Sequence, residues 1–284
     1  MKWTNDTSGG DFEDRRGMGG GGMLMGGGLG TLIIAAIVFF LGGDPSAILS
    51  SGMSQQAPTE QRELTAEDKK IGQFVDMLTG ANKNTWAQIF QENGMNFTPA
   101  KVVVFEQGTQ SGCGTAQSAM GPFYCPSDQT IYMDMNFFQE LQQRFGAQVT
   151  EFSVAYVLAH EYGHHIQNIL GTLGKTEQLR RSGRYSETEM NRVSVATELQ
   201  ADFYAGLWAR KTNDRAQIIE PGDIEAAISA AQAVGDDNIQ RKSQGYVNQE
   251  SFTHGSSQQR KEWFMKGYNT GDIRQGDTFN QLLR

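Results

Sequence analysis

Histidine is scarce in this sequence, and positive charge is outnumbered. The 284 residues include four histidines, and 24 lysines and arginines stand against 32 acids, for a formal net charge of −8. Proteins that bind nucleic acid usually need a basic face that displaces counterions from the phosphates. The charge therefore argues against nucleic acid as a partner. Three of the four histidines nevertheless lie within residues 160–165.

Charge is also missing from a long N-terminal stretch. No charged residue occurs between Gly17 and Gly43, and residues 23–43 form an apolar run of the length that crosses a bilayer as a helix. A cleaved signal peptide would need a shorter run with a small-residue cleavage site, and a buried core helix would fit poorly beside GGGG. We therefore expect a single transmembrane helix, preceded by a disordered glycine-rich tail (1–22) and followed by a linker (44–64).

The charges that flank this run predict its orientation. Arg15 and Arg16 precede it, whereas Asp44 and Glu60 follow it, and positive residues favour the cytoplasmic side. The expected protein is anchored in the plasma or inner membrane by a single pass. Its N-terminus is then cytoplasmic, and residues 65–284 form a periplasmic or extracytoplasmic domain.

Only two cysteines are present, Cys113 and Cys125. An even count in an extracytoplasmic domain predicts a disulfide. The competing interpretation, a metal pair, would need CxxC spacing or nearby histidines, and the segment has neither.

The remaining pattern predicts an α+β fold, mostly helical with a small β-sheet. Apolar periodicity and capping signals indicate the helices, and runs of β-branched and aromatic residues indicate the strands. Helices are expected at 65–80, 86–92, 136–146, 151–170, 186–210, 223–234 and 258–269, and strands at 101–105 and 130–135.

The clustered histidines occur in VLAHEYGHHIQNIL, residues 157–170. On a helix, His160 and His164 lie about 40° apart, whereas His165 lies about 100° further round and cannot share their site. Glu161 flanks the pair. His-Glu-x-x-His is the arrangement in which two imidazoles hold zinc and the glutamate reaches the metal-bound water.

A catalytic zinc needs a third protein ligand and one open position. His254 could supply it, but two acids four residues apart, Glu198 and Asp202, lie on the very apolar stretch NRVSVATELQADFYAGLWARK. Buried carboxylates are costly unless paired or metal-bound, so Glu198 is the expected third ligand, and Asp202 the acceptor of a histidine ring N–H, with His160 the expected donor. The alternative is an acid pair that forms salt bridges with Arg192 or Arg210.

Four blocks together resemble a known family. They are AHEYGHH, ELQADFYAGLWA, GCGTAQSAMGPFYCPSDQTIYMDMNFF and THGSSQQR. With the glycine-rich N-terminus and about residues 60–284, they resemble the predicted neutral zinc metallopeptidases of bacteria, a membrane-anchored group. HExxH followed by Glu-x-x-x-Asp also resembles the gluzincin branch of zinc peptidases. That resemblance implies a zincin-like domain with His160, His164 and Glu198 as ligands, Glu161 as general base and Asp202 behind them.

The expected function is therefore zinc-dependent endopeptidase activity on a peptide or protein substrate. A second donor to the developing oxyanion is expected from His254, with Tyr156 and Tyr185 as rivals. An edge strand, with 130–135 as the candidate, would hold an extended substrate. The alternatives are a hydrolase acting on cell-wall peptide, and a membrane-tethered binding or assembly module with a non-catalytic zinc site.

Overall fold

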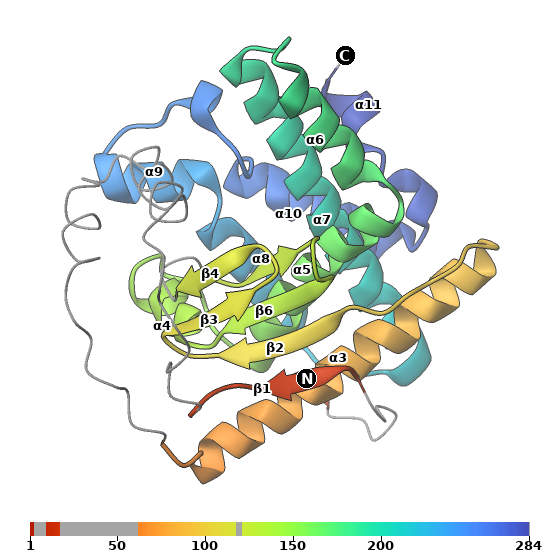
Figure 1. Ribbon diagram of the computed structural model, residues 1–284, viewed down its shortest axis with the longest axis vertical. Coiled ribbons are helices and arrows are strands. Elements are labelled where there is room, and N and C mark those ends of the chain that lie inside the picture. The colour runs from red at the N-terminus through yellow and green to blue at the C-terminus, as the bar shows by residue number, and fades with distance from the viewer. Residues whose placement is uncertain (3–9, 18–61, 118–120, 284) are drawn as a thin grey trace.

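The computed structural model of the chain describes residues 1–2, 10–17, 62–117 and 121–283. Within these ranges a strand-rich part is followed by a helical part (Figure 1). The strands are β1 (Phe12–Asp14), β2 (Lys101–Phe105), β3 (Gly108–Ser111), β4 (Gly114–Gln117), β5 (Phe123–Cys125) and β6 (Thr130–Asp134). The helices are α3 (Ala66–Glu92), α4 (Asn136–Gln143), α5 (Glu151–Ile169), α6 (Thr172–Ser182), α7 (Glu187–Ala216), α8 (Asp223–Ala233), α9 (Asp236–Gln244), η2 (Gln249–Ser251), α10 (Ser257–Thr270), η3 (Ile273–Gln275) and α11 (Thr278–Leu282).

The expected class, mostly helical α+β with a small sheet, is confirmed, but the prediction of a membrane helix is contradicted. In the part of the chain that the structure describes, no helix is both long and apolar enough to cross a bilayer. This finding contradicts the predicted single-pass anchor and the membrane localisation. The predicted span, 23–43, lies outside the described residues, as does nearly all of the predicted linker.

β1 corrects the expected disorder of residues 1–22 at one point. It pairs in parallel with β2, with Phe12 opposite Val102, and the buried Arg16 donates a hydrogen bond of 2.6 Å to Asp14. Hydrogen-bonded strands lie on the same side of any membrane, so this pairing contradicts a cytoplasmic N-terminus with the domain outside. Composition did not indicate β1, because its backbone groups are satisfied by a partner far along the chain.

The main sheet has the order β1-β2-β6-β5, with β5 antiparallel to β6 and the other pairs parallel (Figure 1). β6 therefore lies inside the sheet, and the expectation that residues 130–135 form an edge strand is wrong. Among the described residues the edge strand next to β6 is β5.

Each face of the sheet packs against a different layer, because strand side chains alternate between faces. One face joins the main core with α3 and α5, through Val102, Val104, Ile131 and Met133. The other face forms a small cluster with the β3–β4 hairpin, through Val103, Phe105, Tyr132 and Ala116. The predicted disulfide, Cys113–Cys125, is present and ties the tip of this hairpin to β5.

The helical part is built around α5, α7 and α10, and each of these helices begins at a capping box. Thr150, Ser186 and Ser256 accept a hydrogen bond from the backbone N–H three residues later, and the side chain at that position bonds back. Both α5 and α7 are buried over most of their middle turns. The two helices predicted at 65–80 and 86–92 are one continuous helix, α3.

Candidate metal centre

Two histidines on successive turns of α5 lie next to α7. His160 and His164 are four residues apart, so their side chains stack on one side of the helix. Gly163 permits the helices to touch there, since a Cβ at this position would lie only 3.0 Å from the Cα of Ala201 on α7. The close approach brings the carboxylates of α7 within reach of the two rings.

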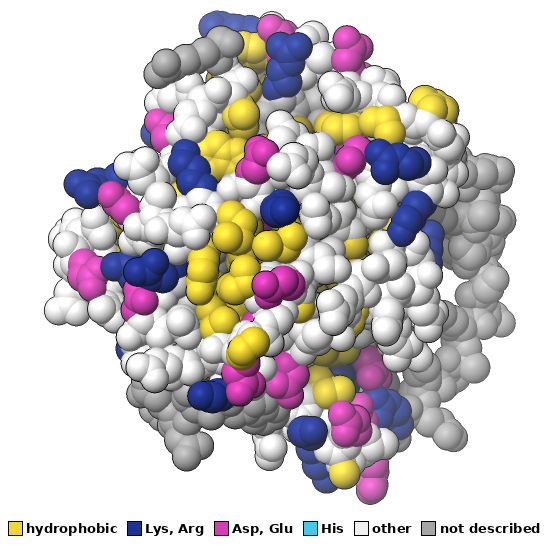
Figure 2. Space-filling model, turned by 180° about the vertical axis from the view of Figure 1, so that it is seen from behind, with side chains coloured by type: hydrophobic (Ala, Val, Ile, Leu, Met, Phe, Trp, Pro, Cys, Tyr) yellow, Lys and Arg dark blue, Asp and Glu magenta, His cyan; other side chains and the backbone are white. Residues whose placement is uncertain are grey.

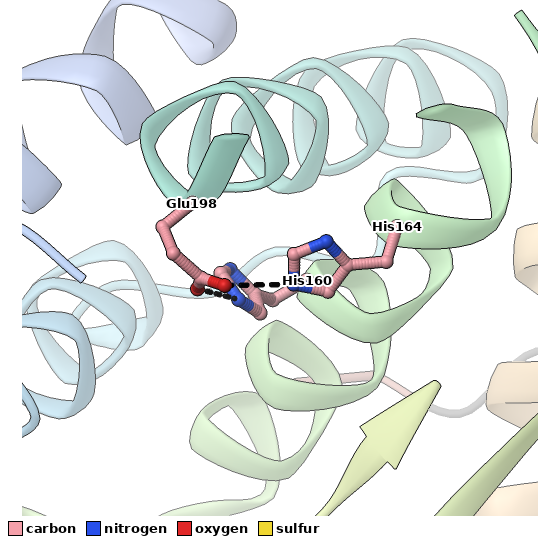
Figure 3. Close-up of side chains that lie close together, drawn as sticks. All are labelled: His160, His164 and Glu198. Atoms are coloured by element: carbon pink, nitrogen blue, oxygen red, sulfur yellow. Dashed lines mark hydrogen bonds and ion pairs between the residues drawn. The ribbon is translucent and has the colours of Figure 1, made fainter. Parts of the chain in front are cut away.

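Glu198 of α7 lies beside both rings (Figure 3). Its Oε2 is 3.2 Å from Nε2 of His160, and its Oε1 is 3.5 Å from Nε2 of His164. The three side chains each offer one ligand atom, and these atoms lie within 4.8 Å of one another. The alternative pairing with Arg210 does not form, because Arg210 bonds Asp214 at 2.9 Å.

The donor set fits a divalent cation. Nδ1 of His160 faces Asp202 Oδ1 at 2.9 Å, and Nδ1 of His164 faces Gln167 Oε1 at 2.8 Å. Gln167 is held in this orientation because its Nε2 donates to the carbonyl of Thr197 at 2.6 Å. Each neutral ring then carries its proton on Nδ1, and both Nε2 lone pairs point at the Glu198 carboxylate. Three acceptors without a donor between them suit a bound cation, and ligands of tetrahedral zinc lie about 3.4 Å apart.

The carboxylates also set the protonation of the rings when no metal ion is bound. Burial lowers the pKa of His164, but Glu198 and then Glu161 outweigh it and raise the pKa to about 9. The pKa of His160 is raised as well: burial opposes the rise, and Asp202 and Glu198 produce it. The pKa of Glu198 lies well below its usual value, since the histidines outweigh burial. Protons and a metal ion therefore compete for the same two nitrogens.

Asp202 lies one turn beyond Glu198 and is completely buried. Besides its contact with the His160 ring, the Asp202 carboxylate accepts hydrogen bonds from the hydroxyl of Tyr156, at 2.6 Å, and from the guanidinium of Arg260. Burial raises the pKa of Asp202, but Arg260 and His160 outweigh it and lower the pKa to about 2. Tyr156 is thus hydrogen-bonded behind the metal centre, and this position does not suit an oxyanion donor.

Arg260 is a residue that the sequence prediction missed. It lies on α10 and is only 3% exposed. A signal was available: the buried residues of α10 are Arg260, Trp263, Phe264 and Gly267, the spacing of a core-facing helical stripe. An arginine on such a stripe implies a buried acid as its partner.

A cleft of about 960 Å³ runs past the metal centre. His160, Glu161, His164 and Glu198 all line it, and Glu161 forms no hydrogen bond with the described residues. Apolar side chains from α4, α8 and α9 line another part, among them Phe137, Leu141, Ala230 and Ile239. The face drawn in Figure 2 carries hydrophobic side chains among mixed charges, and no histidine is visible on it.

His254 lines the same cleft from the loop before α10. Asp236 of α9 holds this loop by accepting backbone N–H groups at 2.6 to 2.9 Å from residues 253–255. Its other oxygen is 3.4 Å from Nδ1 of His254, whose side chain remains 48% exposed. Tyr185, the other predicted rival, is 46% exposed and does not line the cleft.

His165 lies on the opposite side of α5, as its angle on the helix predicts. Its Nδ1 is 3.0 Å from the hydroxyl of Tyr124, and its Nε2 is 2.7 Å from the carbonyl of Thr98. The ring is completely buried and belongs to the core.

Comparison with known proteins places these residues in a family. The sequence profile described as "Putative neutral zinc metallopeptidase" matches residues 1–279. The chain is 41% identical over 231 residues to "Uncharacterized protein YpfJ" of Escherichia coli strain K12, covering 81% of this chain and 78% of the relative. It is 40% identical over 258 residues to "Uncharacterized protein Rv2575" of Mycobacterium tuberculosis strain H37Rv, covering 84% of each. No solved structure matches the chain significantly.

Proposed function

The chain belongs to the neutral zinc metallopeptidase family, and on that premise we propose that it is an endopeptidase that uses zinc held by His160, His164 and Glu198. Family membership supports a peptidase role in general and zinc as the cofactor. The observation that carries the finer proposal is the convergence of the two Nε2 atoms on the Glu198 carboxylate, with Glu161 beside them in an open cleft.

Zinc bound by these ligands would supply Lewis-acid chemistry, by activating a water molecule and polarising a carbonyl group. Glu161 lines the cleft next to the ligands and makes no competing hydrogen bond with described residues. We therefore assign to its carboxylate the role of taking a proton from the attacking water and passing it to the leaving amine. Asp202 holds the Nδ1–H of His160 and keeps the Nε2 lone pair directed into the site.

We assign the second donor to His254. Peptide hydrolysis develops negative charge on the carbonyl oxygen, and a donor aimed at that oxygen lowers the barrier. His254 lines the cleft, and Asp236 and Glu198 raise the pKa of its partly exposed ring. A ring N–H at the cleft suits this role better than Tyr156, whose hydroxyl is bound to Asp202.

The substrate is expected to lie along β5. Phe123 and Tyr124 of this strand line the cleft, and β5 is the last strand of the sheet among described residues. An extended peptide can add to such an edge through backbone hydrogen bonds, which give affinity with little sequence selectivity. The cleft lining continues from α4 and α9 past the ligands to α6, which suits cleavage within a chain.

The test compares the full-length wild type with Glu161→Gln and with a control, Glu92→Gln. Glu92 is an exposed glutamate on α3 that pairs with Lys211, away from the cleft. We measure bound zinc and hydrolysis of casein and of unstructured peptides. One zinc per chain is expected in all three proteins, and only Glu161→Gln should lose hydrolysis, by about a thousandfold.

Two outcomes would overturn this function. Equal hydrolysis by wild type and Glu161→Gln would remove Glu161 from the mechanism. Bound zinc without hydrolysis of any peptide, including cell-wall peptides, would favour a binding module with a non-catalytic metal site.

A further inference from the structure

A buried ion pair lies directly behind the metal centre. The side chains of Arg260 and Asp202 are 4% and 0% exposed. Nε of Arg260 donates to Oδ2 of Asp202 at 2.8 Å, and Nη2 donates to Oδ1 at 3.0 Å. Two parallel bonds from a planar guanidinium fix both the position and the plane of a carboxylate, which a single bond cannot do.

The packing of α7 against α10 holds this pair in register. A Cβ at Gly206, one turn after Asp202, would lie 1.9 Å from the carbonyl oxygen of Phe264. A Cβ at Gly267, about two turns after Arg260, would lie 2.0 Å from the carbonyl oxygen of Phe203. The two helix backbones therefore touch at a crossing that only glycine permits, and neither helix can slide without a clash.

The Asp202 carboxylate, fixed in this way, holds the ring of His160, the first of the three proposed zinc ligands. Oδ1 of Asp202 faces Nδ1 of His160 at 2.9 Å and also receives the hydroxyl of Tyr156 at 2.6 Å. Nη2 of Arg260 in turn lies 3.3 Å from the Tyr156 oxygen and 3.3 Å from Nδ1 of His160, but a ring N–H that donates to Asp202 offers the guanidinium no acceptor. The orientation of the His160 ring is thus fixed by Asp202, and the plane of the Asp202 carboxylate is fixed by Arg260.

We propose that Arg260 is a positioning residue for the metal centre: through Asp202 it holds the His160 ring so that Nε2 faces the zinc position before zinc arrives. The inference rests on the proposed zinc site but does not require that the site hydrolyse peptides. The competing explanation is that Arg260 only balances a buried charge. In that case, folded variants without it would bind zinc as well as the wild type does.

Zinc affinity of the metal-stripped, full-length protein, measured by competition with a chromophoric chelator, separates the two explanations. Partners behind a metal ligand typically contribute 10- to 100-fold to affinity. Arg260→Gln should bind zinc about tenfold more weakly than wild type. Asp202→Asn should show a similar loss, and the double variant should be no weaker than Asp202→Asn, because Arg260 acts through Asp202.

Arg274→Gln is the matched control. Arg274 forms the same forked pair with Asp272, at 2.9 and 2.8 Å, but its side chain is 80% exposed and the pair lies away from the cleft. This variant should bind zinc like the wild type. If Arg260→Gln fails to fold, Arg260→Lys keeps the charge without the fork and should still bind zinc several-fold more weakly.

Cobalt in place of zinc gives a second readout, because its visible absorption reports ligand geometry. The spectrum should change in Arg260→Gln and Arg260→Lys but not in Arg274→Gln. Wild-type zinc affinity and an unaltered spectrum in a folded Arg260 variant would overturn the inference, as would losses that multiply in the double variant. Failure of the wild type to bind one zinc would overturn both the site and the inference. Zinc binding without hydrolysis would count only against the peptidase.

Discussion

Adjacent histidines on α5 lie in opposite environments. His164 faces the cleft, where Glu198 and Glu161 overcome burial and raise its pKa to about 9. His165, the next residue, faces the core, where burial lowers its pKa and its two nitrogens meet the neutral oxygens of Tyr124 and Thr98. A turn of about 100° therefore separates a ring that attracts cations from a ring that is kept neutral.

The contrast shows that the partner element decides the role of an imidazole. The cleft face of α5 lies against α7, which contributes carboxylates, whereas the core face lies against the strand side, which contributes neutral oxygens. Changes on the cleft face should therefore act on zinc and catalysis, and changes on the core face on stability. Each prediction below tests one side of this division.

The largest effect is expected from His164→Ala. The free energy of zinc binding to structural protein sites is about 10–16 kcal/mol, and this variant loses one of three protein ligands. Zinc affinity should therefore fall by about a thousandfold, and hydrolysis should fall with it. Zinc titration and peptide cleavage measure the two losses. Without metal, the variant should melt no more than a few degrees below the wild type. If His164→Ala bound zinc as tightly as the wild type does, His164 would not be a ligand.

A smaller effect on the same side of the division is expected from His254→Gln. Loss of one donor to an oxyanion costs about a hundred- to a thousandfold in kcat, while zinc affinity should not change, because His254 is not among the three clustered ligands. Steady-state kinetics on a peptide and zinc titration test both expectations. Asp236→Asn, which weakens the hold on the His254 loop, should lower kcat in the same direction but less.

The α5–α7 part of the site could be predicted from sequence because it depends on local periodicity. The four-residue spacing of His160 and His164 fixes their common face, and the same spacing places Glu198 and Asp202 on one side of an almost wholly apolar helix. Helical angle also separated His165 from the pair. Gly163 lies inside the motif, but its part in bringing the two helices together became visible only in the contact with Ala201.

What could not be predicted depends on contacts between distant segments. The pairing of β1 with β2, the interior place of β6 and the reach of Arg260 to Asp202 all join residues far apart in the sequence. Periodicity says which side of an element is buried but not which partner covers it. That is why the strand at 130–135 was predicted correctly as a strand and wrongly as an edge.

His165→Leu tests the core side. The substitution leaves the carbonyl of Thr98 without its partner and leaves the Tyr124 hydroxyl with only the amide of Asn168, which costs about 1–3 kcal/mol of unfolding free energy. Chemical denaturation should show this loss, whereas the zinc affinity and kcat of the folded variant should equal those of the wild type. A tenfold loss of zinc affinity with unchanged stability would contradict the division between the two faces.

The smallest change is expected in zinc affinity for each unit of pH, and it tests the same contrast between His164 and His165. In the metal-free protein the pKa of His164 is raised to about 9, and zinc must displace that proton from Nε2. Between pH 9 and pH 7, zinc affinity should therefore fall at least about tenfold for each unit of decreasing pH, and this contribution should vanish above about pH 9. The pKa of His165 is lowered, so its ring stays neutral over this range and adds nothing to the slope. His165→Leu should accordingly give the wild-type slope in a chelator-competition titration, and a flat profile in the wild type would mean that no proton occupies the zinc position.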